Sequence, residues 1–197
     1  MGSKKIFILL GHPDTSGMCG AIADAYERSA RAAGHSVDRI NIGEIQFDPI
    51  LHRGYRAIQA LEPDLERIKN LITACDHFVI IHPIWWTGMP AILKGLFDRV
   101  WLPGSAFRYI KTKAGKRTLF WHRLFKGKTA RIILTSGTPK WMVQLLPGNA
   151  NAQLRWGLLW FAGFRVRTTW FGSAENVPED KKAEWLEKIA VLSAAGR

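Results

Sequence analysis

The sequence has few of the features that mark secreted, metal-binding or membrane-spanning proteins. Its 197 residues include two cysteines, Cys19 and Cys75, and neither belongs to a C-x-x-C pair. A disulfide framework or a thiolate metal site is therefore not expected. No apolar run approaches the roughly 18 residues of a membrane span. The N-terminus lacks the long apolar stretch and cleavage site of a secretory signal, so we expect a cytoplasmic protein.

Several catalytic signatures are also missing. None of the six histidines is paired at i,i+4 on a predicted helix, so no metal site of the zincin type is expected. No G-x-S-x-G elbow anchors a hydrolase triad. Gly127-Lys128-Thr129 is not a P-loop, because it lacks the earlier glycine and precedes a strand. Pro13 takes the place of the second glycine of a dinucleotide fingerprint.

Acidic side chains are scarce: 16 Asp and Glu stand against 28 Lys and Arg, which gives a net charge of +12. Residues 108–131 hold nine Lys or Arg and no acid. Such a stretch can attract nucleic acid, an anionic membrane surface or a phosphorylated cofactor. A solvated loop face explains the charge as well, and we favour that interpretation. No nucleic-acid-binding motif accompanies the charge, so nucleic acid is not an expected partner.

The chain alternates between strand-like and helix-like segments. Two fully apolar runs, residues 6–10 and 78–81, suit strands buried on both faces of a parallel sheet. The other expected strands cover residues 37–42, 130–134 and 164–171, and helices are expected over residues 21–33, 65–72, 90–102 and 154–161 and from Pro178 onward. Alternation of this kind predicts a parallel sheet with helices on both faces.

Five strands and five helices predict one flavodoxin-like α/β domain over residues 1–197, a three-layer sandwich with sheet order 2-1-3-4-5. In that order the chain changes direction between strands 1 and 3, and ligands bind beyond the carboxyl ends of those strands. Residues 11–20 and 82–90 form the loops at that point. Residues 135–141, after strand 4, are expected to contribute as well.

The first loop reads Gly11-His-Pro-Asp-Thr-Ser-Gly-Met-Cys-Gly20 and opens a helix. Free backbone N–H groups and the helix dipole make such a turn an anion site. Thr15 and Ser16 add hydroxyl donors for a phosphate. The same hydroxyls also suit a simple helix cap. The place of the loop at the switch point favours phosphate binding.

The second loop contains Trp85 and Trp86, which cannot both face the core easily. Aromatic side chains next to an isoalloxazine ring stack on it and exclude water. The alternative is that the two large residues plug the end of the sheet. The third loop, Thr135-Ser-Gly-Thr-Pro-Lys140, has small residues that let the backbone approach a ligand closely. Its amides suit the negative charge near N1 and O2 of a reduced flavin.

A long motif gives a family resemblance. The chain from residue 82 reads His82-Pro-Ile-Trp-Trp-Thr-Gly-Met-Pro-Ala-Ile-Leu-Lys-Gly-Leu-Phe-Asp-Arg-Val100. It resembles the signature P-x-x-W-x-G-x-P-A-x-L-K-G-x-x-D/E-R-V of the NAD(P)H:quinone oxidoreductase (DT-diaphorase-like) family, which includes bacterial quinone reductases and ancillary subunits of potassium efflux systems. Weaker similarities at residues 11–13, 47–50 and 159–164 extend the resemblance over nearly the whole chain.

The resemblance implies a flavodoxin-like homodimer that binds FAD or FMN non-covalently. It also implies ping-pong transfer of two electrons from NAD(P)H to a quinone-like acceptor. Carried over by motif, the residues expected at the flavin phosphates are His12, Thr15 and Ser16; those bordering the isoalloxazine are Pro83, Ile84, Trp85, Trp86 and Thr87; and those on its pyrimidine side are Thr135, Ser136 and Gly137. No catalytic side chain is assigned, because the chemistry is centred on the flavin, with Trp86 as a pocket wall.

The chain departs from the family pattern in three places. Gly17-Met18 stand where the family often has Phe-Asn. The third loop of the quinone reductases is usually Thr-Thr-Gly-Gly followed by a Tyr and a His, whereas here Thr138-Pro-Lys-Trp141 follows Thr135-Ser-Gly137. No Tyr or His occurs from residue 135 to residue 177, so the proton-handling residues of the family do not carry over. The basic stretch, residues 108–131, also looks longer than the matching family segment.

Two questions about function stay open at this stage. The alternative to an enzyme is a flavin-bearing regulatory subunit that docks on a membrane transporter through residues 108–131. Together with Phe107, those residues interleave cations with five aromatic side chains, which suits peripheral contact with anionic lipid. The same residues also suit a lid over the active site, whose cations attract the phosphates of NAD(P)H. Of lipid contact and a lid, we favour the lid, since the matching family segment lies near the substrate pocket.

Overall fold

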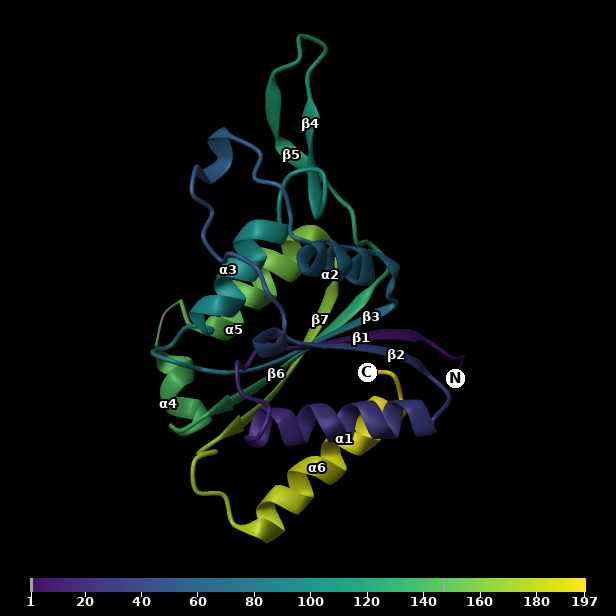
Figure 1. Cartoon of the computed structure of the whole chain (residues 1–197), viewed down its shortest axis with the longest axis vertical. Helices are drawn as coiled ribbons and strands as arrows, with labels where there is room; N and C mark the ends of the chain where they lie inside the picture. The colour runs from purple at the N-terminus through teal and green to yellow at the C-terminus, as the bar shows by residue number, and fades with distance from the viewer. Residues whose placement is uncertain (1, 147) are drawn as a thin grey trace.

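The computed structural model describes residues 2–146 and 148–197 and forms three layers around a parallel sheet (Figure 1). Along the sheet the strand order is β2-β1-β3-β6-β7. The strands are β1 (Lys5–Leu10), β2 (Ser36–Asn41), β3 (His77–Pro83), β6 (Thr129–Ser136) and β7 (Arg165–Gly172). Numbered among themselves, these five strands have the predicted order 2-1-3-4-5. β2 and β7 are the two edge strands.

Helices cover both faces of the sheet (Figure 1). One face carries α1 (Met18–Ala32) and α6 (Glu179–Ala194), and the other carries α2 (Pro63–Ala74), α3 (Ala91–Val100), α5 (Ala150–Ala152) and the π-helix η3 (Gln153–Trp160). The short helices η1 (Ile42–Glu44), η2 (Gly54–Arg56) and α4 (Lys140–Leu145) were not expected from the sequence. Within residues 2–146 and 148–197, every helix is too short or too polar to span a bilayer.

The central strands are apolar on both faces because both faces are covered. Phe7 and Leu9 of β1 pack in the core under α2 and α3, whereas Ile6 and Ile8 pack in the core under α1 and α6. All four side chains are at most 1% exposed. Burying each of them contributes about 1.5–3 kcal/mol, so the two cores hold the strand ends in fixed positions.

Prolines begin the helices that the sequence predicts best. Pro63 is the first residue of α2, and Pro90 and Pro178 directly precede α3 and α6. Proline has no N–H to lose at this position, and its fixed φ suits the first turn. Apolar residues at helical spacing on α3 then face the sheet, with Leu93 and Leu96 fully buried. The first turn of α3 is therefore anchored beside the end of β3.

Residues 108–131 are mostly a hairpin, so the interpretation of this stretch as a loop is wrong. β4 (Phe107–Lys111) and β5 (Arg117–Arg123) pair antiparallel outside the main sheet and project beyond α2 and α3 (Figure 1). Phe107 and Phe125 are buried, and Tyr109 and Trp121 pack against the core. Of the five aromatic side chains, only Phe120 is fully on the surface, at 73% exposed.

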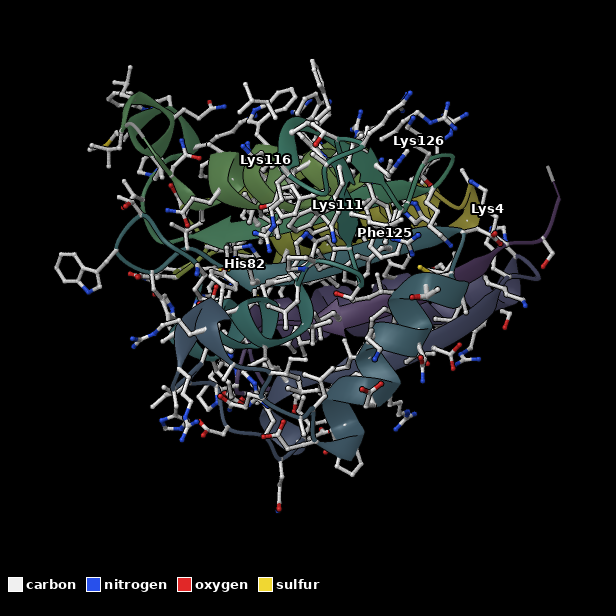
Figure 2. The ribbon with its side chains drawn as sticks, turned by 90° about the horizontal axis from the view of Figure 1, so that it is seen from above. Lys4, His82, Lys111, Lys116, Phe125 and Lys126 are labelled. Carbon is white, nitrogen blue, oxygen red and sulfur yellow. The ribbon has the colours of Figure 1, made fainter. Side chains whose placement is uncertain are left out.

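The cations of this stretch have two different environments. Lys111, Lys116 and Lys126 spread over the end of the molecule that carries the hairpin (Figure 2). Arg131, by contrast, lies near the amino end of β6, a strand inside the sheet, and is 4% exposed. The favoured description of a solvated basic face therefore fits the hairpin and does not fit Arg131.

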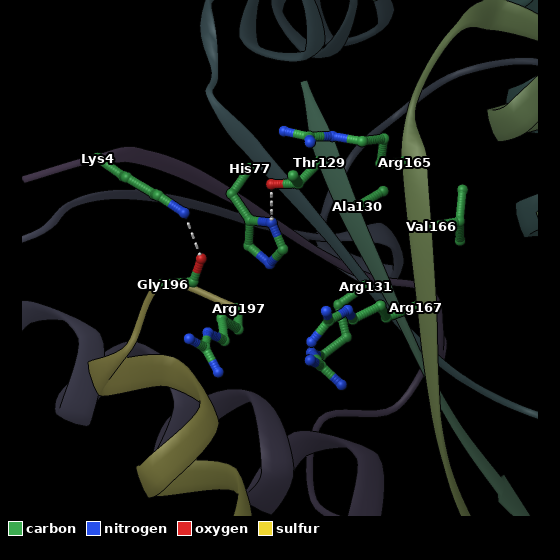
Figure 3. Close-up of a pocket in the computed structure, with 10 residues that line it drawn as sticks. All are labelled: Lys4, His77, Thr129, Ala130, Arg131, Arg165, Val166, Arg167, Gly196 and Arg197. Carbon is green, nitrogen blue, oxygen red and sulfur yellow. Dashed lines mark hydrogen bonds between the residues drawn. The ribbon is translucent and has the colours of Figure 1, made fainter. Parts of the chain in front are cut away.

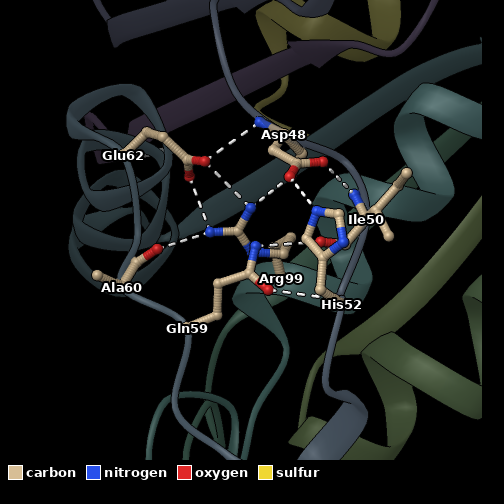
Figure 4. Close-up of polar contacts among 7 residues, drawn as sticks. All are labelled: Asp48, Ile50, His52, Gln59, Ala60, Glu62 and Arg99. Carbon is tan, nitrogen blue, oxygen red and sulfur yellow. Dashed lines mark hydrogen bonds and ion pairs between the residues drawn. The ribbon is translucent and has the colours of Figure 1, made fainter.

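Arg99, the arginine of the family-like motif, ties α3 to the segment after β2 (Figure 4). Its side chain is 1% exposed. Its guanidinium donates to both carboxylate oxygens of Glu62 and to the main-chain oxygens of Asp48 and Ala60. Asp48 in turn accepts from the main-chain N–H of Ile50 at 2.9 Å. Arg99 thus fixes residues 48–62 against the helix that follows the second loop.

Candidate active site

The three loops predicted to bind a ligand meet at the carboxyl ends of β1, β3 and β6. Together they line a pocket of about 160 Å³. The predicted cofactor-binding residues that line it are His12, Pro83, Ile84, Trp85, Thr135, Ser136 and Gly137. Larger cavities of about 390 and 490 Å³ lie elsewhere on the molecule, so size does not single this pocket out. Its position at the switch point of the sheet is what identifies this pocket as the candidate site.

Four predicted residues, Thr15, Ser16, Trp86 and Thr87, stand on the same loops without lining the pocket. Five residues that the sequence analysis missed do line it: Gly17, Met18, Cys19, Ala174 and Glu175. Ala174 and Glu175 follow β7, the sheet neighbour of β6. Since the carboxyl ends of parallel strands share one edge, the residues after strand 5 belonged among the candidates as well.

The amino end of α1 offers free hydrogen-bond donors. Gly17 precedes the helix and supplies no side-chain cap, and the first turn holds no acid. A Cβ on Gly20 would stand 1.7 Å from the main-chain oxygen of Thr15, so the loop packs directly on this turn and requires glycine there. Main-chain N–H groups at an uncapped helix start suit an anion such as a phosphate.

Ser16, one of the residues predicted to contact a phosphate, is already hydrogen-bonded to Asp14. Its carboxylate accepts hydrogen bonds from the main-chain N–H of Ser16 at 2.9 Å and from the Ser16 hydroxyl at 2.8 Å. These two bonds lower the pKa of Asp14, so the carboxylate is ionised at neutral pH. An anion at this loop therefore competes with Asp14 for the donors of Ser16. His12 is also engaged, because its Nδ1 lies 2.7 Å from the carbonyl oxygen of Asp14 and 2.9 Å from the main-chain nitrogen of the same residue.

The tryptophan pair sits on a tight turn with an unusual backbone. Trp85 and Gly88 exchange main-chain hydrogen bonds of 3.0 and 2.9 Å. The two residues between them are left-handed, with φ of 48° at Trp86 and 64° at Thr87. Positive φ at both central residues defines a type I′ turn, which normally takes Asn or Gly. A bulky or β-branched residue there stores about 1–3 kcal/mol of strain.

This turn directs Trp86 into solvent, where it is 100% exposed. The alternative that both tryptophans plug the end of the sheet is therefore wrong for Trp86. Trp85 is 45% exposed and packs edge-on against His12, with ring centroids 5.4 Å apart. Trp85 thus forms part of the pocket wall, and Trp86 projects from the same turn into solvent.

Hydrogen bonds fix the third loop in place. Ile84 donates its main-chain N–H to the carbonyl of Thr135 at 2.8 Å, which joins the second and third loops. The Ser136 hydroxyl donates to the carbonyl of Thr138 and accepts from the Trp170 indole at 3.0 Å. The side chain of Ser136 is therefore committed to the loop. A Cβ on Gly137 would stand 2.3 Å from the Glu175 carboxylate, so a larger residue there would displace the Glu175 side chain.

The buried titratable groups at this edge are electrically neutral at pH 7. Burial raises the pKa of the Cys19 thiol to about 11, and the thiol contacts the Thr135 hydroxyl at 3.2 Å. Burial lowers the pKa of His82 to about 4. His82 Nδ1 bonds to the carbonyl of Pro83 at 2.8 Å, and its Nε2 has no partner within the described residues. The site thus holds a preorganised backbone and aromatic surfaces rather than a charged acid–base pair.

Comparison with known proteins places this geometry in context. A family model described as the flavodoxin-like fold matches residues 4–194. A protein of Haemophilus influenzae called an uncharacterized NAD(P)H oxidoreductase is 32% identical over 135 residues, 66% of this chain and 63% of its own length. The rat NAD(P)H dehydrogenase [quinone] 1 is 25% identical over 214 residues, 95% of this chain and 75% of its own length.

The similarity to bacterial relatives is partial. The Escherichia coli uncharacterized NAD(P)H oxidoreductase YcaK is 27% identical over 112 residues, and the match covers 57% of its length. The chain thus spans about three fifths of the two bacterial relatives. Among solved structures, Smu.1420 from Streptococcus mutans superposes with a TM-score of 0.82 and 29% identity, covering 97% of this chain and 99% of that one.

Proposed function

The chain belongs to the flavodoxin-like fold family, and from that membership we propose that it is a flavin-dependent enzyme that passes two electrons from NAD(P)H to a quinone-like acceptor. The observation that carries the proposal is the convergence of three loops and the uncapped start of α1 on one pocket. The relatives called NAD(P)H oxidoreductase and NAD(P)H dehydrogenase [quinone] support it. The ping-pong order of the reaction is part of the proposal.

The residues present fit a flavin of the FMN or FAD type. The first turn of α1 would hold its phosphate, with Thr15 and the main chain of residues 17–20 as donors. The main chain of residues 84–87 and 135–137 would border the ring system. When bound, the flavin accepts a hydride from NAD(P)H and returns two electrons to the acceptor.

The protein's own part in this reaction is positioning. The hydrogen bond between Ile84 and Thr135 keeps two loop backbones in register at the pocket. Trp85 and Trp86 provide flat apolar surfaces that exclude water from one side. No side chain has to deliver a proton for hydride transfer itself, which agrees with the neutral state of Cys19 and His82.

We also propose that the active form is a homodimer whose pockets lie at the interface. The pocket is small, and large apolar side chains near this end of the sheet are open to solvent. They include Trp86 at 100% exposed, Leu145 at 75% and Trp141 at 63%. Exposed apolar surface of this kind marks an interaction site, and a two-fold partner would complete the pocket wall. We place the enzyme in the cytoplasm, where NAD(P)H is available and free cysteines such as Cys19 and Cys75 persist.

The regulatory alternative keeps one observation in its favour. The hairpin β4–β5 projects from the body of the protein, and none of its residues lines the candidate pocket. A lid role within one chain is therefore not supported, whereas docking on another surface is compatible with the shape. Peripheral contact with anionic lipid would place the same hairpin cations at the membrane.

The decisive experiment measures cofactor and turnover together. Purified protein should absorb near the flavin bands, or take up FMN or FAD with micromolar affinity or better, roughly 8 kcal/mol. The released cofactor is then identified by mass spectrometry. NAD(P)H oxidation should depend on added quinone. Protein that neither carries nor takes up flavin contradicts the proposal, and flavin without turnover favours the regulatory subunit.

A further inference from the structure

A second cavity lies at the amino edge of the sheet, opposite the candidate active site. In Figure 2, Lys4 marks this edge and His82 lies near the other one. The cavity has a volume of about 390 Å³, and among the described residues no carboxylate side chain lines it. The last residue of the chain, Arg197, does line it, and its main-chain oxygen accepts a hydrogen bond from the Tyr26 hydroxyl. Its nitrogen-bearing side chains are Lys4, His77, Arg131, Arg165, Arg167 and Arg197 (Figure 3).

Arg131 is the buried member of this cluster. It is 4% exposed, and its guanidinium donates to the Thr169 hydroxyl at 2.7 Å. Its Nε has no hydrogen-bond partner, and within the described residues Arg131 forms no ion pair. A buried arginine is normally paired with a carboxylate or another anion, since an unpaired charge loses its hydration without compensation. Burial accordingly lowers the pKa of Arg131.

The neighbours of Arg131 add further positive charge around it. Arg167 stands directly opposite Arg131 in the parallel pairing of β6 with β7. Figure 3 shows the two guanidinium groups side by side, with Arg197 on the other side of the imidazole of His77. Like charges that face each other across neighbouring strands are destabilising. The arrangement becomes favourable when an anion lies between them.

His77 provides a second unpartnered group at the same cavity. It is 2% exposed, and its Nδ1 bonds to the Thr129 hydroxyl at 2.7 Å. Within the part of the chain that the structure describes, its Nε2 makes no hydrogen bond of normal geometry, although the main chain of Arg197 lies near the ring. Burial, with Lys4 and Arg131 nearby, lowers the pKa of His77 to about 3. The ring is therefore neutral at pH 7 and has one nitrogen left for a ligand atom.

We propose that this cavity binds the phosphate group of a small phosphorylated ligand. Guanidinium groups bind phosphate oxygens by charge-assisted, often bidentate hydrogen bonds. Arg131 at the floor and the exposed Arg165 and Arg167 at the rim would hold it from two sides. A concave site of this size accommodates a ligand as large as a nucleoside monophosphate. It lies across the sheet from the flavin phosphate site and is independent of it.

The test uses inorganic pyrophosphate as the probe at constant ionic strength. At roughly 100 times its dissociation constant, pyrophosphate should raise the melting temperature of the protein by about 5–11 °C. The double variant Arg165→Gln/Arg167→Gln changes two exposed side chains, so it should fold normally. It should bind pyrophosphate about tenfold more weakly or worse. The matched variant Lys111→Gln/Lys113→Gln removes the same charge from the hairpin and should bind as the wild type does.

A variant at the buried Arg131 tests the proposal independently of the two exposed arginines. Arg131→Met keeps the aliphatic stem and removes the charge. Without pyrophosphate its melting temperature should equal or exceed that of the wild type, because an unpaired buried charge has been removed. With pyrophosphate it should show no further increase. A loss of stability without ligand, with the pyrophosphate response intact, would overturn the proposal.

Two further results would also overturn it. One is a pyrophosphate effect no larger than that of sodium chloride at equal ionic strength, or equal in both double variants. The other is tight binding of a single-stranded oligonucleotide that depends on Arg165 and Arg167 but is not displaced by pyrophosphate. That result would make the cationic edge a nucleic-acid surface instead.

Discussion

Arg99 and Glu62 meet through two parallel contacts, with guanidinium nitrogens 3.1 and 2.9 Å from the two carboxylate oxygens. Burial acts to raise the pKa of Glu62, but the hydrogen bonds from Arg99, those from main-chain N–H groups and the charge of Arg99 together outweigh it and hold this pKa below its usual value. Arg99 is almost fully buried, whereas Glu62 is 30% exposed. The ion pair therefore holds the segment after β2 over the Arg99 guanidinium, whose charge has no access to water.

Removal of the Glu62 carboxylate should leave the buried charge of Arg99 without its paired anion. We expect Glu62→Gln to lower the free energy of unfolding by about 3 kcal/mol, and Arg99→Met in the same chain to restore part of it. Urea denaturation measures both. The control is Asp98→Asn, which breaks the exposed pair with Lys94 and should cost less than about 1 kcal/mol. Equal stability of Glu62→Gln and wild type would show that the pair is not structural.

Stability should fall as the pH drops from about 6.5 to about 4. The folded-state pKa values of His82 and His77, about 4 and about 3, lie below the value of 6.5 for an exposed histidine. Between those values the unfolded chain binds protons that the folded chain does not, so acid favours unfolding. For His82 alone the loss amounts to about 3 kcal/mol by pH 4.

The variant His82→Phe should flatten this dependence, whereas His122→Gln, at an exposed position, should leave it unchanged. Denaturation at pH 6.5, 5.5 and 4.5 separates the effect from that of the carboxylates, which protonate at lower pH. Parallel curves for His82→Phe and wild type would mean that His82 titrates normally.

The strained turn predicts opposite effects on stability and activity. Trp86→Gly should raise the free energy of unfolding by about 1 kcal/mol, because glycine adopts positive φ without strain. Activity should fall, since the aromatic wall is lost. Trp156→Ala, at another exposed tryptophan, should leave activity unchanged. A loss of 3 kcal/mol or so in Trp86→Gly would mean that the ring is packed in a core after all.

Asp14 should weaken the binding of a phosphate-bearing flavin. Asp14→Ala frees the donors of Ser16 and removes a negative charge, so FMN should bind about three- to tenfold more tightly. Glu187→Gln removes an equal charge from the exposed face of α6 and should have no effect. Fluorescence titration gives both affinities. Weaker binding in Asp14→Ala would show that the carboxylate instead orders the loop for the ligand.

The strands and helices were predictable where apolar spacing and prolines coincide. Residues 6–10 and 78–81 are buried on both faces, as their unbroken apolar runs predict. Pro63, Pro90 and Pro178 located three helix starts to within a residue. The loops that line the pocket followed from the same topology, because the sheet order decides which loops meet. The seven named residues among its lining came from the resemblance to the family motif.

The side-chain partners were not predictable in the same way. Nothing local distinguishes Arg131 from its exposed neighbours in a basic stretch, because its burial depends on α1 and α6 covering that face of the sheet. The bonds between Asp14 and Ser16 depend on the path of a loop that contains no periodic pattern. The hairpin was missed because its cations and aromatics alternate irregularly around a bulge near Tyr109.

The two edge strands differ from the central strands β1 and β3 in a way that affects association between molecules. β2 carries Asp38 and Arg39, and β7 carries Arg165 and Arg167, whereas β1 and β3 are almost wholly apolar along their length. A strand that added to either edge would have to dehydrate those charges. The sheet is thereby protected against edge-to-edge polymerisation, which would otherwise compete with correct folding at high concentration.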